Sequence, residues 1–397
     1  MTSRLIASVC VLCVHPVVLR AVEPDRFAAV EAAATAALAR GDCPGAVIVV
    51  VHNDEVIYRK SYGDRAVKPG KIPMTPDTVF DLASLTKPIA TGTSIMLLIE
   101  RQKLRLDDKV AAYWPAFAAN AKGDVTIAQL LLHTSGLTAD NSVADYADGG
   151  EKAFERIARL KLEAPAGTRF RYSDVGFIVL GLLVERVGGM PVDRFAQQNV
   201  FDPLKMTCTG FRPAAGLIPR IAPTGKREGT TILGDIHDPR AHLLGGVAGH
   251  AGLFAPADDL ARYVRMLLRG GELDEARILK PETVKLFTEP HEVPVGLVEG
   301  KQKTASRKLL RSYGWDVDTG FTAQRGELFP KGEGYGHTGF TGTSIWVDPR
   351  SRAAVIILTN RVHPDDKGNV TRLRREVGTA VANSLANGRR EPTGGKP

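Results

Sequence analysis

The chain has 397 residues, of which 44% are hydrophobic and 24% are charged. This length allows one large domain or two closely packed ones, with a core that needs no structural metal or disulfide. The formal net charge is +8. The basic residues are scattered rather than clustered, which argues against a nucleic-acid partner and allows a peripheral contact with the anionic cell envelope.

The first 21 residues predict a secretory signal, and therefore a periplasmic or secreted protein. Arg4 provides the basic start, an apolar run covers 5–19, and the small Ala21 follows. The run is shorter than the roughly 20 residues that span a bilayer. Arg20 occupies a position where cleavage favours a smaller residue, so an N-terminal anchor that stays uncleaved is the alternative.

Regular elements begin at residue 25. A helix is predicted over 25–41, strands over 45–52 and 55–63 form an antiparallel hairpin, and an apolar helix follows over 84–102. The chain is then almost entirely helical, with helices predicted over 126–132, 150–162, 177–187 and 191–202. Segment 212–252 is rich in glycine and proline and lacks a period, which is typical of a functional or flexible loop.

The C-terminal part mixes strands and helices. It predicts helices over 257–269, 281–288 and 370–385, strands over 332–337, 342–348 and 352–358, an exposed loop over 296–312 and a disordered tail over 387–397. The predicted fold class is α+β. Residues 22–102 and 253–386 form an antiparallel sheet lobe flanked by helices, and 103–252 form an inserted, mostly helical lobe with the irregular loop. A functional site is expected in the cleft between the lobes.

A serine and a lysine three residues apart stand at the start of the apolar helix. On a helix Ser84 and Lys87 are neighbours, with Cβ atoms roughly 5–6 Å apart. The positive charge of the helix N-terminus favours the alkoxide and disfavours the ammonium, so the lysine can take the serine proton. The alternative is a helix-capping serine beside an ordinary solvated lysine.

Two further segments can supply partners for Ser84. Tyr172 precedes a buried helix, and a phenol with a depressed pKa can carry protons to the leaving group and from water; the alternative is a tyrosine packed in the core. His337, Thr338 and Gly339 end a glycine-rich strand. The edge of that strand can offer a backbone N–H to an oxyanion, with the Ser84 N–H as the second donor. A simple turn with an exposed histidine is the alternative.

Other polar residues carry weaker signals. The loop residues Asp235, His237, Asp238 and His250 suggest a metal, but hydrogen bonding within the loop is the better interpretation, and we expect neither a metal nor a cofactor. Arg361 follows the last strand, and it either binds an anionic group at the pocket rim or lies on the surface. Outside the predicted signal, Cys43 and Cys208 are the remaining cysteines, and the sequence leaves their redox state open.

Taken together, these motifs resemble the serine β-lactamase and penicillin-binding-protein superfamily. The ordered motifs are Ser84-Leu-Thr-Lys87, Tyr172-Ser-Asp174 and His337-Thr-Gly339. The supporting segments are 131–137, 248–254, 258–260, 348–349 and 358–361. The chain is most similar to the class C branch, which includes D-alanyl-D-alanine carboxypeptidases, D-aminopeptidases and esterases.

The resemblance implies a β-lactamase/transpeptidase-like fold and acyl transfer through an acyl-enzyme on Ser84. Lys87 and Tyr172 would share the general-base work, and the backbone N–H groups of Ser84 and Phe340 would form the oxyanion hole. Substrate-binding roles would fall on Asp174, His337, Thr338, Gly339 and, at the rim, Arg361. No metal enters this scheme.

The chain departs from the class C pattern at two positions, because that pattern has Asn at 174 and Lys at 337. Histidine is mostly neutral at pH 7, so the fixed positive charge that would hold a substrate carboxylate is missing. We therefore expect a serine hydrolase for amide or ester bonds. It would act as a D-amino-acid peptidase, an esterase or a weak β-lactamase on cell-wall fragments. The alternative is a penicillin-binding sensor or a pseudoenzyme that uses the same cleft.

Overall fold

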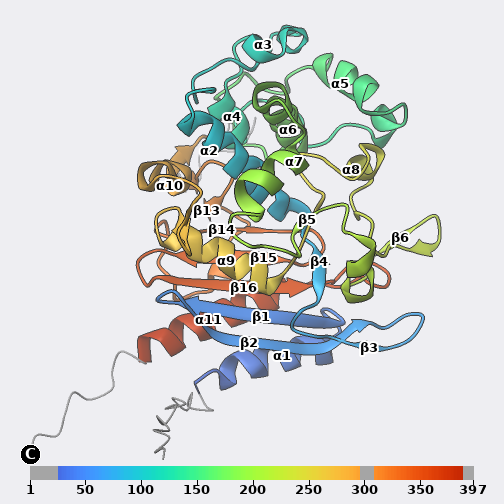
Figure 1. The fold of residues 1–397 in the computed structure, drawn as a ribbon, viewed down its shortest axis with the longest axis vertical. Coiled ribbons are helices and arrows are strands. Elements are labelled where there is room, and N and C mark those ends of the chain that lie inside the picture. The colour runs from blue at the N-terminus through green and yellow to red at the C-terminus, as the bar shows by residue number, and fades with distance from the viewer. Residues whose placement is uncertain (1–25, 296–307, 388–397) are drawn as a thin grey trace, which may run out of the picture.

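A computed structural model describes residues 26–295 and 308–387. Its largest element is a nine-stranded antiparallel sheet with the strand order β11-β12-β13-β14-β15-β16-β1-β2-β3 (Figure 1). The strands are β1 Gly45–His52, β2 Glu55–Ala66, β3 Ile72–Pro73, β11 His291–Val293, β12 Leu309–Arg311, β13 Asp316–Asp318, β14 Tyr335–Thr338, β15 Ser344–Asp348 and β16 Ala353–Thr359.

Strands from the two ends of the chain meet in the middle of this sheet. β1 pairs with β16 from Ala46 opposite Thr359 to His52 opposite Ala353, and it pairs with β2 through a hairpin. β1 consists mainly of valine and isoleucine, because a strand buried on both faces favours β-branched residues. The prediction of an antiparallel sheet built from both chain ends is confirmed. The division into two lobes stays a prediction.

Different helices cover the two faces of the sheet (Figure 1). On what we call the outer face, α1 Ala28–Arg40 and α11 Thr371–Asn387 lie side by side and share a core with Ile48 of β1. On the inner face, α9 Ala257–Leu268 packs against β1 and β16, and Val49 belongs to that core. Successive β1 residues serve opposite cores because strand side chains alternate.

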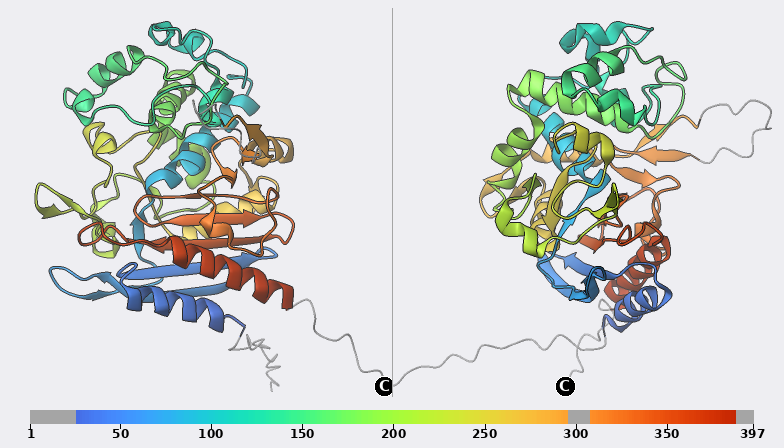
Figure 2. Two further views of the ribbon diagram at one scale, coloured as in Figure 1. Left: turned by 180° about the vertical axis from the view of Figure 1, so that it is seen from behind. Right: turned by 90° about the vertical axis from the view of Figure 1, so that its right-hand side faces the viewer.

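The inner face carries the rest of the molecule, which Figure 2 shows from two more sides. Most residues of α2 Thr93–Glu100 and α6 Asp174–Gly188 are buried, and the two helices contact each other. The other helices are α3 Val110–Tyr113, α4 Ile127–Leu131, α5 Gly150–Ala158, α7 Val192–Ala196, α8 Pro239–Leu243 and α10 Pro281–Thr288. A small sheet has the order β4-β8-β5, with β4 Val79–Asp81, β8 Leu253–Pro256 and β5 Gly210–Phe211.

The structure corrects two predictions in the C-terminal part of the chain. The sequence predicts a loop over 296–312, whereas Leu309–Arg311 is strand β12. The strands β11, β12 and β13 are short and contain charged residues, so they give no alternating apolar signal. Asn387, placed in the predicted tail, is the last residue of α11. The predicted signal, the rest of the tail and residues 296–307 lie outside the described residues.

Cys43 and Cys208 are both free in this structure. Within the described ranges no single helix is long and apolar enough to cross a membrane. The bent pair of α6 and Val192–Phe201 reaches that length and composition only when the two helices are taken together.

Candidate active site

Ser84 lies in a tight turn between β4 and α2. This turn, Ala83–Leu85, is a single 3₁₀ turn that continues into a π-helical stretch over Lys87–Gly92. Ala83 has a φ of 46°, an uncommon conformation for a residue other than glycine, and such strain is often found at functional sites. The Ala83 N–H donates to Asp81 Oδ1 at 2.8 Å, so the preceding strand holds the turn in place.

Asp81 itself is buried and links the turn to two loops. Its second carboxylate oxygen accepts a hydrogen bond from the His237 N–H at 2.7 Å, and its carbonyl oxygen accepts one from Thr341 Oγ1 at 2.7 Å. Burial raises the pKa of Asp81 to about 7, although the two backbone donors oppose the shift. The serine therefore stands on a turn that is fixed from three directions.

Lys87 is completely buried beneath the serine. Its Nζ donates to Ser84 Oγ at 2.9 Å and to the His250 carbonyl at 3.1 Å, and it lies 2.6 Å from Asp174 Oδ1. These three contacts match the three donors of an ammonium group. Burial alone would lower the pKa of Lys87, but Asp174 and Tyr172 outweigh it and raise the pKa above its usual value. The resting lysine is therefore charged.

Asp174 contacts the lysine and is not among the residues that line the cavity described below. The sequence predicts that Asp174 binds the substrate; the structure places it at the first position of α6, where the positive helix end favours a carboxylate. Burial would raise the pKa of Asp174, but Lys87 and His250 outweigh it and lower the pKa below its usual value. The buried Lys87 and the half-buried Asp174 thus form an ion pair behind Ser84.

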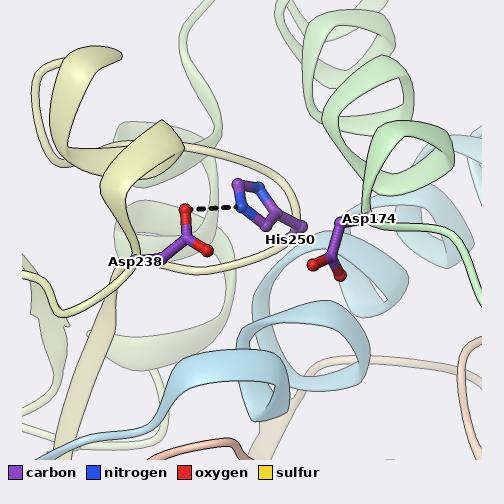
Figure 3. A group of neighbouring side chains, drawn as sticks. All are labelled: Asp174, Asp238 and His250. Carbon is purple, nitrogen blue, oxygen red and sulfur yellow. Dashed lines mark hydrogen bonds and ion pairs between the residues drawn. The ribbon is translucent and has the colours of Figure 1, made fainter. Parts of the chain in front are cut away.

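A second pair lies next to Asp174 (Figure 3). His250 Nε2 is 3.0 Å from Asp238 Oδ1, and in the described part of the chain these two residues and Asp174 are the group close enough to share a metal ion. Asp174 is already paired with Lys87, so hydrogen bonding within the loop remains the better interpretation. The other two loop residues point elsewhere: Asp235 contacts Arg227 and His242, and the His237 ring stacks on Phe340 at 5.5 Å.

Tyr172 comes to the serine from the segment before α6. Its hydroxyl is close enough to Lys87 and Ser84 for both to lower its pKa, and Lys87 Nζ lies 4.9 Å from its ring centre. Burial raises the pKa of Tyr172 and exceeds the opposing effect of Lys87, so the depressed pKa proposed from sequence is wrong. A neutral phenol at rest can donate a proton.

His133 supports this tyrosine, and sequence reasoning missed it. Its ring lies 4.5 Å from the Tyr172 ring, and its Nδ1 accepts a hydrogen bond from the Ser173 N–H at 3.0 Å. The sequence signal that could have indicated His133 is the segment Leu131-Leu-His-Thr-Ser-Gly-Leu137, one of the segments that support the family resemblance. His133 has a positive φ of 57°, which is uncommon for a residue other than glycine.

β14 forms the opposite wall of the site. His337 is buried, and its Nδ1 lies 2.8 Å from the Thr338 carbonyl, so that nitrogen carries the proton. Burial, assisted by Arg311 and Lys87, lowers the pKa of His337 well below its usual value. The imidazole is thus neutral, as expected from sequence, and the alternative of an exposed histidine does not hold. A Cβ on Gly339 would lie 2.4 Å from the Leu82 carbonyl, so glycine lets this strand approach the serine turn.

These elements surround a cavity of about 580 Å³. Of the predicted residues, it is lined by Ser84, Tyr172, His337, Thr338, Gly339, Phe340 and Arg361. Arg361 Nε donates to the Phe340 carbonyl at 2.7 Å, and its guanidinium covers the Phe340 ring at 4.5 Å. Sequence reasoning missed Phe321, Arg311, Asp316, Lys367 and Arg374, which also line the cavity.

The described cavity wall is cationic at its polar positions. Four basic side chains line it, and Asp316 is the one acidic residue among the lining residues. Phe321 and Phe340 expose more than half of their surface at the same cavity, 55% and 54% respectively. The cavity therefore combines a half-buried nucleophile with positive charge and two aromatic faces, a composition suited to an anionic ligand with an apolar or sugar-like face.

Comparison with known proteins agrees with this arrangement. The family described as Beta-lactamase matches residues 30–379. A protein of Escherichia coli K12 named "Putative D-alanyl-D-alanine carboxypeptidase" is 32% identical over 358 residues, which cover 81% of this chain and 79% of that protein. The N-acetylmuramyl-L-alanine amidase of Bacillus subtilis 168 is 30% identical over 369 residues, covering 82% and 80%.

A solved structure gives the same result in three dimensions. EstCE1, a hydrolase with promiscuous acyltransferase activity, superposes with a TM-score of 0.71 at 26% identity and covers 90% of this chain and 98% of its own. The predicted β-lactamase/transpeptidase-like fold is confirmed, whereas assignment to the class C branch stays a prediction. The chain belongs to the beta-lactamase family.

Proposed function

We propose that this protein is a serine hydrolase that cleaves amide or ester bonds in cell-wall fragments through an acyl-enzyme on Ser84. The observation that carries the proposal is the 2.9 Å hydrogen bond from Lys87 Nζ to Ser84 Oγ at the wall of a large cavity. A surface serine that caps a helix would not stand beside a completely buried lysine. The proposed reaction class is acyl transfer to water.

The proposed steps begin with attack of Ser84 Oγ on the substrate carbonyl carbon. An ammonium has no lone pair, so Lys87 accepts the serine proton only after giving one of its own to Asp174. The backbone N–H groups of Ser84 and Phe340 stabilise the oxyanion. The bond to the leaving group then breaks, and the Tyr172 phenol donates a proton to the departing nitrogen or oxygen.

Deacylation runs through the same groups in the opposite direction. Water adds to the acyl carbon while the Tyr172 phenolate takes its proton. The bond to Ser84 Oγ then breaks as the Lys87 ammonium protonates the serine, and Asp174 returns its proton to Lys87. The contact with Asp174 keeps the Lys87 amine close to Ser84. His337 and Thr338 bind the substrate from the β14 edge.

Three features support cell-wall fragments as the substrate class. The similar proteins are named for a D-alanyl-D-alanine carboxypeptidase and an N-acetylmuramyl-L-alanine amidase, and both names describe amide bonds of cell-wall material. Such fragments carry carboxylates and sugars, which suit a cationic cavity with two exposed phenylalanines. A periplasmic or secreted location, proposed from the N-terminal signal, would bring the protein to this material.

The test is hydrolysis by the purified protein of a nitrophenyl ester, a chromogenic cephalosporin, a D-alanyl-D-alanine peptide and N-acetylmuramyl-L-alanine. We expect turnover of the ester and of at least one cell-wall amide, abolished in Ser84→Ala. A stable adduct on Ser84 without turnover would instead identify a penicillin-binding sensor. No labelling by a fluorophosphonate probe would identify a pseudoenzyme.

A further inference from the structure

Asp81, the last residue of β4, carries a buried carboxyl group that takes no part in the proposed proton transfers. The residue is 1% exposed, and its neighbours Phe80 and Leu82 belong to the apolar core. Burial raises the pKa of Asp81, and Asp238 and Asp235 add smaller contributions in the same direction. A buried carboxylate in such surroundings costs stability, so we expect its contacts to serve another purpose.

One oxygen of this carboxylate holds the chain directly before the nucleophile. Asp81 Oδ1 accepts a hydrogen bond from the Ala83 N–H at 2.8 Å, and Thr86 Oγ1 donates to the Ala83 carbonyl at 2.7 Å. The positive φ of Ala83 persists only because surrounding contacts impose it. The Ala83 carbonyl and the Ser84 N–H belong to the same peptide group. The direction of the Ser84 N–H is therefore set by these contacts.

The backbone of Asp81 holds the turn that carries Phe340. The Asp81 carbonyl accepts a hydrogen bond from Thr341 Oγ1 at 2.7 Å, and the Leu82 carbonyl accepts one from Thr343 Oγ1 at 3.0 Å. Both threonines are fully buried in the turn between β14 and β15. Because Thr341 directly follows Phe340, these bonds tie the Phe340 peptide to the strand that precedes the serine.

The second oxygen of the carboxylate reaches the Phe340 side chain through a third segment. Asp81 Oδ2 accepts a hydrogen bond from the His237 N–H at 2.7 Å, and the His237 ring stacks on the Phe340 ring. The Phe340 side chain is 54% exposed, so no apolar core fixes its position. One buried residue thus joins the chain on both sides of the proposed oxyanion hole.

We propose that Asp81 is a positioning residue that fixes the spacing of the two oxyanion-hole donors, the backbone N–H groups of Ser84 and Phe340. The inference rests on the proposed function, because these donors stabilise an oxyanion only if an acyl-enzyme forms on Ser84. A carboxylate suits the task, since it offers one acceptor oxygen to each of two N–H groups. The two donors are then in place before the substrate arrives, as electrostatic stabilisation of an oxyanion requires.

Asp81→Asn tests this role, because the amide keeps the shape of the side chain but can accept from only one of the two N–H groups. We expect kcat and kcat/KM on a nitrophenyl ester to fall together by about 100-fold. KM should stay within about threefold, since the oxyanion hole serves acylation and deacylation alike. The inhibition constant of phenylboronic acid, which forms a tetrahedral adduct with a serine hydroxyl, should rise by about the same factor as kcat falls.

Thr341→Val tests the same spacing from the other donor. Valine keeps the branched shape and removes the hydroxyl that bonds to the Asp81 carbonyl. We expect kcat to fall by about tenfold with KM unchanged. The double variant should lose little more than Asp81→Asn alone, because both substitutions relax one spacing, whereas independent effects would multiply to about 1,000-fold.

Asp259→Asn is the matched control. Asp259 of α9 is 7% exposed, and its Oδ2 accepts hydrogen bonds from the Cys208 N–H at 2.9 Å and from Thr209 Oγ1 at 2.8 Å. Burial raises its pKa, as it does for Asp81. This substitution removes a buried carboxylate of the same kind from another part of the fold. It should leave kcat/KM and the inhibition constant within about twofold of wild type.

The outcomes separate this inference from the proposed function. An absence of ester turnover by the wild type would refute the proposed function itself. If the wild type is active and folded Asp81→Asn keeps both its kcat and its affinity for phenylboronic acid, the inference alone is overturned, and Asp81 only holds the fold together. Multiplying effects in the double variant, or the same losses in Asp259→Asn, would also overturn it. If Asp81→Asn does not fold, Thr341→Val decides, and an unchanged inhibition constant there would overturn the inference.

Discussion

The two faces of the central sheet are built in opposite ways. On the outer face, α1 and α11 cover β1 and β16 with a core of aliphatic and aromatic side chains. On the inner side, the protein buries Asp81, Lys87, His250 and His337 around one cavity. Apolar burial stabilises a fold, whereas buried charges destabilise it unless each finds a partner. The outer face thus contributes stability, and the inner side accepts polar burial to position reactive groups.

This contrast predicts that substitutions on the inner side mainly lower kcat/KM, whereas substitutions on the outer face mainly lower the free energy of unfolding. Ser84→Ala should have the largest effect, a loss of at least about 10⁴-fold in kcat/KM on a nitrophenyl ester, because the nucleophile is gone. Its midpoint of urea unfolding should stay within experimental error, since the hydroxyl has little role in packing. Ser135→Ala, at a serine without a lysine three residues on, is the control. Residual activity within tenfold of wild type would rule out Ser84 as the nucleophile.

Lys87→Ala should have the second-largest effect on kcat/KM, and it should also lower the stability, because this residue serves both catalysis and burial. We expect a loss of about 10³-fold in kcat/KM, since the serine loses its proton acceptor. Removing the cation also leaves the half-buried Asp174 without its lysine partner, which should lower the free energy of unfolding by about 3 kcal/mol at pH 7. Urea titration of variant and wild type measures this difference. A fully active Lys87→Ala protein would contradict the proposed role.

On the outer face the order of effects should reverse. Leu373 of α11 is fully buried against the sheet, and Leu373→Ala should lower the free energy of unfolding by about 2–5 kcal/mol through the cavity that it leaves. The kcat/KM of the folded protein should change by less than about twofold. Arg372→Ala, at the exposed neighbouring position, should change the free energy of unfolding by less than about 0.5 kcal/mol. A catalytic defect in folded Leu373→Ala would show that the two faces are coupled.

The same contrast explains what could be predicted from sequence. The valine run of β1 and the periodic helices show apolar spacing, so the centre of the sheet and its covering helices can be predicted from sequence, whereas the short strands β11, β12 and β13 cannot. The short sequence motifs located Ser84 and Lys87 because their chemistry depends on one helical turn. Arg311 gives no such signal, since it lies in a three-residue strand that is too short to show an alternating apolar pattern. The sequence likewise does not show that Asp174 pairs with Lys87, because the two residues meet only in the folded structure.

Among the substitutions at the serine site, Asp174→Asn should have the smallest effect on kcat/KM. It tests most directly whether Asp174 controls the charge of Lys87. The amide should keep kcat/KM within about tenfold, because Lys87 remains beside Ser84. The acceptor that raises the pKa of Lys87 is lost, so burial prevails and the folded-state pKa of Lys87 falls below its usual value. The rise of kcat/KM with pH, which reports the neutral amine, should move to lower pH than in the wild type.

Stability gives an independent reading of the same change. In the wild type the folded-state pKa of Lys87 is raised, so the pair's contribution is fully present below the unfolded-state pKa of about 10.4 and is lost only as the pH rises through the folded-state pKa. In Asp174→Asn the unfolded state binds the extra proton, so the free energy of unfolding should increase with pH between the lowered pKa and about 10.4. Urea unfolding of both proteins from pH 6 to 10 measures the difference. Parallel stability curves would show that the carboxylate does not control the charge of the lysine, and the ion pair behind the serine would then have no part in setting its reactivity.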